Sequence, residues 1–389
     1  MQKKKFFLIL VILIFLAASL TAGSYFYMRN KIYAPTPISE NQESETKPKI
    51  EEEVKYQEEK GITNILLIGT DGRTLDEASR SDSIIIATID GSRQKVKFTS
   101  IMRDTYVKIP GHSDQKINAA YAYGGAELLM NTIKENFGLS IDKYIIINFW
   151  GFEDIVDAMG GLDIDVKDYE ISEINKYIGE IREDKSNPII KAGLQNLDGQ
   201  QALAYARIRK VGNGSYERTE RQRYVMTLMA EKAKDISPVK YPSVVNALLS
   251  CVKTNIEPIN FFNYGYTFYK FTNPVYEQLQ IPATELSEGR EFLNKGWVLL
   301  IDRDQNGNII KDFILNDKKW ISSDYNQASF ENAMLQYKNQ ETKYNQETKY
   351  NNDKKDKETI NKNETQEEKV DLNDYEETMN EQDVEKGDF

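Results

Sequence analysis

The stretch that decides the fold class is Asn64-Ile65-Leu66-Leu67-Ile68-Gly69-Thr70-Asp71-Gly72-Arg73. Its first half is an unbroken apolar run with the length of a buried strand, and its second half is a polar turn. Two more apolar runs, 83–89 and 96–102, follow it and also border charged residues. In α/β folds the ends of such strands usually carry the active site. The charged residues at these strand ends are Asp71, Asp82, Arg103 and Asp104.

Helical and strand patterns alternate along the rest of the globular region, which predicts an α/β fold with a central mixed sheet flanked by helices. A charged, weakly patterned segment at 168–191 is expected to be a surface excursion. Helices are expected at 126–136, 151–159, 216–233 and 244–252, with one more capped by Asp198, and strands at 144–149, 162–166, 277–282 and 297–301.

The composition limits the kinds of catalytic and metal sites that the protein can contain. The 389 residues carry a net charge of -11 and are 40% hydrophobic, which is enough for one large domain with tails. The single cysteine, Cys251, excludes an internal disulfide and a thiolate metal cluster. The single histidine, His112, excludes a site with several histidine ligands. Phosphate-loop, dinucleotide and nucleophile-elbow motifs are all missing, so any catalysis must rest on carboxylates, arginines and a hard metal.

The N-terminus has the pattern of a membrane anchor, which we assign to residues 1–31. Three lysines precede an apolar run from Phe6 to Ala22, and tyrosines follow it. This order predicts a single-pass helix with a cytoplasmic N-terminus and an extracellular domain in the cell membrane. A signal peptide cleaved near Ala22 is the alternative, and the flanking tyrosines favour the anchor. Residues 32–60 are polar and are expected to be an extended spacer.

The C-terminal tail, residues 331–389, is rich in Asn, Glu, Lys, Asp and Gln. A six-residue unit, Asn-Gln-Glu-Thr-Lys-Tyr, repeats in tandem from Asn339 and Asn345. A segment with so few residues to bury is predicted to be disordered. The catalytic domain is therefore expected to span 61–330.

One motif between these regions imitates a calcium site. Asp302, Asp304, Asn306 and Gly307 match the first half of an EF-hand loop, but Phe313 stands where the closing Glu is required. Asn-Gly is also the strongest signal for a two-residue hairpin. We therefore expect a hairpin that joins strands at 297–301 and 309–315.

Arginines concentrate in one stretch of this acidic chain. Arg207 and Arg209 share a face if the backbone there is extended, whereas Arg218, Arg221 and Gln222 share a face of a helix. A guanidinium matches phosphate oxygens two at a time, so this stretch predicts a polyanion site. The alternative is a solvated basic face in which the helix arginines pair with Glu217 and Glu220.

The sequence contains seven distinctive blocks, at 64–73, 80–82, 103–107, 116–125, 148–165, 197–209 and 218–222. Together they resemble the LytR-CpsA-Psr family in order and spacing, from about Ile62 to Asp235, and the family's domain continues to near Ile301. One departure is Met102, because the family commonly has proline immediately before the arginine that corresponds to Arg103.

The resemblance implies a membrane-bound phosphotransferase of Gram-positive bacteria. Such an enzyme moves an anionic glycopolymer, of teichoic acid or capsule type, from polyprenyl pyrophosphate to peptidoglycan. A muramic acid hydroxyl attacks the phosphorus next to the sugar, and polyprenyl phosphate leaves. Catalysis of this kind depends on charge neutralisation. The implied pyrophosphate-binding residues are Arg73, Arg103, Lys116, Arg207, Arg209, Arg218, Arg221 and Gln222.

The remaining roles implied by the resemblance are a metal site and a general base. Asp71 and Asp82 would hold Mg²⁺, or Mn²⁺. Asp82 and Asp104 are both candidates for the base, and Asp104 alternatively orients Arg103. Lys116, which opens a helical segment, is alternatively a solvated lysine. Candidate linings of a polyprenyl pocket, each alternatively ordinary core, are Ile133, Phe137, Phe149, Phe152, Val156, Val225 and Met229.

Three other functions compete with transfer. A carrier-lipid binding protein or pyrophosphohydrolase would use the same arginines, and the sequence does not choose between water and a sugar hydroxyl as nucleophile. A transcriptional regulator is disfavoured, since an acidic extracellular domain without a basic recognition helix does not suit nucleic acid. A surface adhesin would leave the arginines and the strand-end aspartates unexplained.

Overall fold

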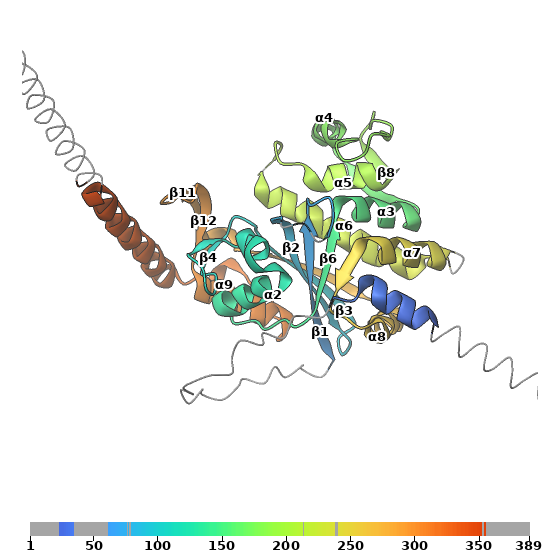
Figure 1. Cartoon of the computed structure of the whole chain (residues 1–389), viewed down its shortest axis with the longest axis horizontal. Coiled ribbons are helices and arrows are strands. Elements are labelled where there is room, and N and C mark those ends of the chain that lie inside the picture. Colours follow the sequence, from blue (N-terminus) through green and yellow to red (C-terminus); the bar gives the residue numbers. More distant parts are fainter. Residues whose placement is uncertain are drawn as a thin grey trace, which may run out of the picture.

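A six-stranded mixed sheet forms the centre of the computed structural model, which describes residues 23–34, 61–75, 77, 79–212, 214–237, 240–351 and 354 (Figure 1). The strand order is β10-β3-β2-β1-β6-β9. β1 pairs with β6, and β3 with β10, in parallel, whereas the other neighbours are antiparallel, so the predicted mixed sheet is confirmed. The strands are β1 (Ile62–Thr70), β2 (Ser81–Asp90), β3 (Lys95–Ile101), β6 (Tyr144–Asn148), β9 (Val252–Thr254) and β10 (Val275–Ile281).

Helices cover both faces of this sheet (Figure 1). Successive side chains of a strand point to opposite faces, so the unbroken apolar runs of β1 and β2 supply a core on each side. Leu66 and Ile68 pack with α2 (Asn118–Phe137) and α9 (Arg303–Ile314). The opposite face, with Leu67 and Ile85, is covered by α3 (Phe149–Met159), α5 (Gly199–Arg207), α6 (Ser215–Asp235), α7 (Tyr241–Cys251) and α8 (Pro258–Tyr269).

Smaller elements surround these layers. Three two-stranded sheets pair β4 (Tyr106–Val107) with β5 (Gln115–Lys116), β7 (Leu162–Val166) with β8 (Gly193–Leu197), and β11 (Ser287–Glu291) with β12 (Trp297–Ile301). The expected surface excursion contains a helix, α4 (Asp168–Tyr177). In α2 the chain kinks at Gly124 and Gly125, where Gly125 has a φ of 62°. This kink separates the short opening helix from the helix predicted at 126–136.

The predicted hairpin at Asn306-Gly307 is wrong, because both residues lie inside α9. Asp302 caps this helix by accepting a hydrogen bond from the Gln305 backbone N–H at 3.0 Å. The Asn306 amide is fully buried and binds the Ala283 N–H at 2.9 Å. A Cβ at position 307 would lie 2.8 Å from the Phe137 carbonyl oxygen, so the glycine permits close helix packing. These residues serve tertiary contacts that short-range turn statistics do not contain.

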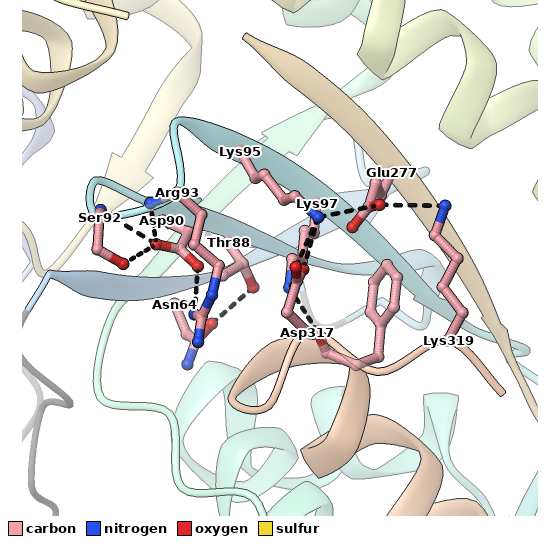
Figure 2. A network of polar contacts seen from close by, with 11 residues as sticks. Asn64, Thr88, Asp90, Ser92, Arg93, Lys95, Lys97, Glu277, Asp317 and Lys319 are labelled. Atoms are coloured by element: carbon pink, nitrogen blue, oxygen red, sulfur yellow. Dashed lines mark hydrogen bonds and ion pairs between the residues drawn. The ribbon is translucent and has the colours of Figure 1, made fainter.

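At the end of the sheet where β3 and β10 begin, buried charges form a closed network (Figure 2). The fully buried Lys97 pairs with Asp317 at 2.8 Å and donates to the Phe313 carbonyl at 2.6 Å. Lys95 bonds Asp317 at 2.7 Å and Glu277 at 3.3 Å. Burial disfavours the charged form of Asp317, but hydrogen bonds from the two lysines outweigh this effect and lower its pKa to about 2. Each charge in this network stabilises its neighbour.

The chain termini differ in part from prediction. Residues 327–351 are helical, so disorder is the wrong expectation for 331–351, and the rest of the tail lies outside the described residues. Tyr337 explains the difference, because its ring is buried against Tyr106 and Phe292. Residues 23–32 are also helical, and Tyr33 bridges to Thr254 of β9. The predicted bilayer run and most of the spacer lie outside the described residues. Within the described ranges, every helix is too short or too polar to cross a bilayer.

Candidate active site

The sheet brings the predicted strand-end residues together at one edge. β1 and β2 are antiparallel and pair Thr70 with Ser81, so the end of β1 lies beside the start of β2. β3 returns antiparallel to β2, with Ser100 opposite Ile85, so its end reaches the same edge. Asp71, Asp82 and Arg103 therefore converge, as the strand pattern predicts.

Ion pairs join these residues into a chain. The Arg103 Nη1 donates to Asp82 Oδ1, and its Nε lies 3.6 Å from Asp104 Oδ2. Asp104 Oδ1 also holds the Lys116 Nζ at 3.1 Å. On the other side, Arg209 Nη2 lies 3.9 Å from Asp82 Oδ1. Asp104 thus contacts two cations at once, which fits a carboxylate that orients Arg103.

Arg218 of α6 is the most deeply buried cation of this group, with 2% of its surface exposed. Its Nε and Nη1 are buried and have no hydrogen-bond partner among the described residues. Burial, followed by the nearby Arg209 and Arg103, lowers the pKa of Arg218 to about 10, so the group remains charged at neutral pH. A buried cation with open donors is costly unless an anion completes it. This guanidinium therefore marks an anion site.

Arg207 and Arg209 do not share an extended segment, and that expectation is wrong. Arg207 is the last residue of α5, and Ile208, with φ -54° and ψ 131°, leaves the helix. The Arg207 guanidinium lies 4.8 Å from the Phe149 ring and 2.7 Å from Glu180 Oε2. The Asp198 cap and buried alanines keep α5 helical to this point. The two arginines consequently contact different carboxylates.

The structure separates three predicted pyrophosphate ligands from the cluster formed by Arg103, Arg209 and Arg218, whereas Lys116 joins this cluster through Asp104. Arg221 is held by Glu170 and Glu217, both at 2.8 Å. The Arg73 side chain is exposed, and its carbonyl accepts from Asn148 at 3.2 Å. Gln222 instead lines a cavity.

This cavity has a volume of about 250 Å³ and lies between the sheet and helices α3, α5, α6 and α7. Its lining is apolar except for Ser83, Asn148, Arg207 and Gln222. Ser83 follows Asp82, and Gln222 lies one helical turn after Arg218, so the polar part of the lining adjoins the arginine cluster. Another hollow of about 270 Å³ lies beside α9 and is lined without any arginine.

Four of the seven candidate lining residues border this cavity: Phe149, Phe152, Val225 and Met229. The other three belong to separate cores. Ile133 and Phe137 pack on the opposite face of the sheet, and Val156 packs beneath β7 and β8. A sequence pattern identifies apolar faces but does not show which of them remain unfilled.

Asp71 and Asp82 are the two carboxylates predicted to hold a metal ion. Burial and, after it, the Asp82 carboxylate raise the pKa of Asp71 above its ordinary value. A cation between two such carboxylates would relieve their repulsion, so these donors fit a hard divalent ion. Across the residues that the structure describes, however, no three Asp, Glu, His or Cys side chains gather as a metal-binding group. A bound ion would therefore need further oxygen ligands from phosphate or water.

Three contributors escaped the sequence interpretation. Glu180 and Tyr177 come from the segment expected to be a surface excursion, yet both contact the Arg207 guanidinium. Arg223 is buried in α6 and donates to Ser100 of β3. The charged segment carried no signal of this role. For Arg223 the sequence did contain a signal, because this residue stands directly after the recognised Arg-Thr-Glu-Arg-Gln block.

Known proteins were compared with this chain and with its structure. The LytR_cpsA_psr family model matches residues 26–313. The regulatory protein MsrR of Staphylococcus aureus (strain COL) is 34% identical over 260 residues, which cover 66% of this chain and 76% of MsrR. The polyisoprenyl-teichoic acid–peptidoglycan teichoic acid transferase TagT of Bacillus subtilis (strain 168) is 34% identical over 200 residues, covering 50% of this chain and 60% of TagT.

Solved structures agree with these matches. TagT bound to LI-WTA superimposes with a TM-score of 0.55 at 27% identity and covers 66% of this chain and 91% of TagT. The LytR-CPS2A-psr family protein YwtF (TagT) with bound octaprenyl pyrophosphate lipid gives a TM-score of 0.51 at 27% identity, covering 66% and 90%. With the family match spanning most of its length, this chain belongs to the LytR_cpsA_psr family.

Proposed function

We propose that this protein is a membrane-anchored, extracellular phosphotransferase that moves an anionic glycopolymer from polyprenyl pyrophosphate to peptidoglycan. The observation that carries the proposal is the buried Arg218, which has two donors without a partner among the described residues and precedes Gln222, a residue lining an apolar cavity, by one helical turn. An anion site next to an apolar cavity suits an amphiphile with a charged head and a hydrocarbon tail. TagT, named as a teichoic acid transferase, and the related structure with bound octaprenyl pyrophosphate support this substrate class.

The proposed binding mode divides the substrate between the two parts of the site. The prenyl chain enters the cavity lined by residues such as Phe152 and Met229. The pyrophosphate then meets Arg218, Arg209 and Arg103. Arg218 gains most from this contact, because phosphate oxygens would complete donors that the protein leaves open.

In the proposed reaction, a muramic acid hydroxyl attacks the phosphorus that bears the glycan. The new bond joins that phosphorus to the acceptor oxygen, and the bond to the bridging oxygen breaks, so polyprenyl phosphate leaves. Asp82 and Asp104 each contact two cations, and Asp82 is the proposed base because its side chain is the more exposed, at 22% against 13%. Arg103 and Arg209 lie beside Asp82, where they would stabilise the charge that develops on the phosphoryl oxygens.

Asp71 and Asp82 are the residues that would hold Mg²⁺ or Mn²⁺. A bound divalent ion would neutralise pyrophosphate charge and polarise the phosphoryl oxygens. The raised pKa of Asp71 supports the assignment, because it reflects burial and a nearby carboxylate, which a cation would offset.

The test uses the full chain reconstituted in vesicles with a labelled glycan on polyprenyl pyrophosphate and soluble peptidoglycan strands. Transfer predicts equal amounts of polyprenyl phosphate and of label on peptidoglycan. Release of polyprenyl phosphate together with glycan phosphate that is not attached to peptidoglycan would instead establish hydrolysis. Asp82→Asn should abolish turnover, whereas Asp142→Asn, which alters an exposed carboxylate paired with Lys143, should not. Full activity in EDTA would contradict the metal assignment.

A further inference from the structure

Helix α8 carries an exposed apolar stripe that the proposed reaction does not use. None of its 12 residues is charged, although charged residues make up 29% of the chain. Ile259, Phe262, Tyr266 and Tyr269 are exposed by 54%, 58%, 60% and 66%. Their spacing of three, four and three residues places them on one face of the helix. Exposed apolar surface of this kind usually marks an interaction site.

The opposite face of α8 attaches the helix to the domain. Phe268 packs in the cluster that contains Val96 and Phe98 of β3, and its ring lies 5.9 Å from that of Phe271. The helix is therefore held by its inner face. The outer stripe is not part of this cluster and is available for a partner.

The N-terminal helix, residues 23–32, meets α8 at its first turn. Arg29 Nε lies 3.1 Å from the carboxylate of Glu257, the residue that precedes α8, and the Tyr25 hydroxyl donates to the same carboxylate at 3.1 Å. Figure 1 shows this helix beside α8. It also exposes aromatic side chains, because Phe26 and Tyr27 are each 60% exposed. Both helices at this junction thus carry exposed aromatics.

The position of this junction in the chain identifies the partner. The apolar run from Phe6 to Ala22 ends three residues before Tyr25. Three residues of helix rise only about 4.5 Å, so a bilayer that contains this run would lie next to α8. Aromatic residues are enriched at the headgroup level of membranes, and tyrosine is well suited to that depth.

We infer that α8 and the N-terminal helix form a membrane-docking face, with Phe26, Tyr27, Ile259, Phe262, Tyr266 and Tyr269 seated in the headgroup region of the bilayer. Charge agrees with this assignment. The whole chain is acidic and would be repelled by anionic lipids, but α8 has no carboxylate. Lys270 follows it, with its Nζ 4.3 Å from the centre of the Tyr266 ring.

Docking by this face would fix the height of the domain above the bilayer, so the domain would not swing freely on a tether. It would also place one wall of the apolar cavity near lipid. Val252 lines that cavity and belongs to β9, the strand that contacts Tyr33 through Thr254. The inference rests on exposure and position, and it holds whether the enzyme transfers or hydrolyses its substrate.

The experiment measures the environment of single nitroxide labels on the full chain in lipid nanodiscs. Labels are placed at Phe262→Cys and Tyr266→Cys in a Cys251→Ser background. Ile190→Cys is the control, since Ile190 is an isolated apolar side chain with 86% exposure. We expect the two α8 labels to collide more often with oxygen than with a water-soluble nickel chelate, and the control to show the reverse.

Two results would overturn the inference. Labels on α8 that behave like the control would mean that the stripe faces water. Labels shielded from both reagents would mean that protein, rather than lipid, covers it. Ile259→Cys and Tyr269→Cys provide the same measurement if either first variant does not fold. A full chain that does not remain with the discs would contradict the docking face as well.

Discussion

The two ends of strand β3 hold buried cations in opposite ways. At its start, Lys95 and Lys97 contact Asp317 at 2.7 and 2.8 Å, and these contacts lower the pKa of Asp317 to about 2 (Figure 2). Beyond its end, Arg218 keeps two buried nitrogens without partners among the described residues, and burial with nearby arginines lowers its pKa to about 10.

The difference shows how to separate structural from functional charges in one protein. In the lysine network the protein supplies the counter-charges, so the network stabilises the fold without any ligand. In the arginine cluster the protein supplies fewer counter-charges than Arg218 requires, so the folded state carries a cost that an anionic ligand removes. Depth of burial does not distinguish the two, because both Lys97 and Arg218 are buried.

The largest effect should come from Asp317→Ala. This change leaves the fully buried Lys97 without its carboxylate, so we expect the free energy of unfolding to fall by about 3–5 kcal/mol. Urea denaturation measures it. Lys319→Met is the matched control, since Lys319 is 68% exposed although it binds the same network through Glu277. Its effect should stay within about 0.5 kcal/mol. Equal losses in both variants would contradict a special cost of leaving the buried Lys97 without its carboxylate.

Arg218→Lys and Arg218→Met should behave in the opposite manner. Loss of the guanidinium removes a preorganised donor, so transfer should fall about a hundredfold, or about 3 kcal/mol. Stability should be unchanged or higher, because the variants relieve a buried cation with open donors. Turnover and thermal unfolding, measured in parallel, test the expected loss of activity and the expected retention of stability. A variant that unfolds readily yet transfers normally would mean that Arg218 stabilises the fold and does not bind the substrate.

A smaller effect is expected at the more exposed arginines. Arg209→Lys retains charge near Asp82 but loses the planar fork, and the Arg209 side chain is 42% exposed. Transfer should fall roughly tenfold, or about 1.4 kcal/mol. Arg207→Lys should show a similar loss, since Arg207 lines the cavity and already binds Glu180. Wild-type rates in both variants would mean that these arginines take no part in transfer and belong to a solvated basic face.

The lysine network should also make stability depend on pH. Asp317 has a folded-state pKa of about 2 against an ordinary value of 3.8. Its contribution to stability is therefore present above about pH 4 and is lost as the pH falls towards 2. The difference in unfolding free energy between the wild-type protein and Asp317→Asn should narrow in that window. A difference that persists unchanged at pH 2 would contradict the assigned pairs.

Strand patterns predicted the sheet and the convergence of Asp71, Asp82 and Arg103, because buried strands have a simple signature and their ends are easy to locate. The arrangement of the arginines was harder to predict from the sequence. Whether Arg207 ends a helix or extends a strand depends on how the alanines of α5 pack, which is a tertiary property.

Sequence reasoning failed most clearly where one residue has two physical uses. Asn306-Gly307 fits a tight turn, but in the structure the asparagine bonds the Ala283 backbone and the glycine packs against Phe137. Arg207 pairs with Glu180, and Arg221 with Glu170, both far away in sequence. The second partner of Arg221, Glu217, is the local pair that the sequence offered as an alternative. No local pattern can show which arginines find such partners and which remain open.

The C-terminal helix, residues 327–351, is held to the domain at its root by Tyr337 and by a pair between Arg290 and Glu341 at 2.9 Å. Figure 1 shows it projecting from the body. Its tandem repeat has six residues, and a six-residue step turns a helix about 240° past a full rotation. Equivalent side chains of successive repeats therefore point in different directions and form no seam for a partner helix. Mechanically, this segment is a rigid helical spacer that sets the distance and direction from the domain to the residues that follow it.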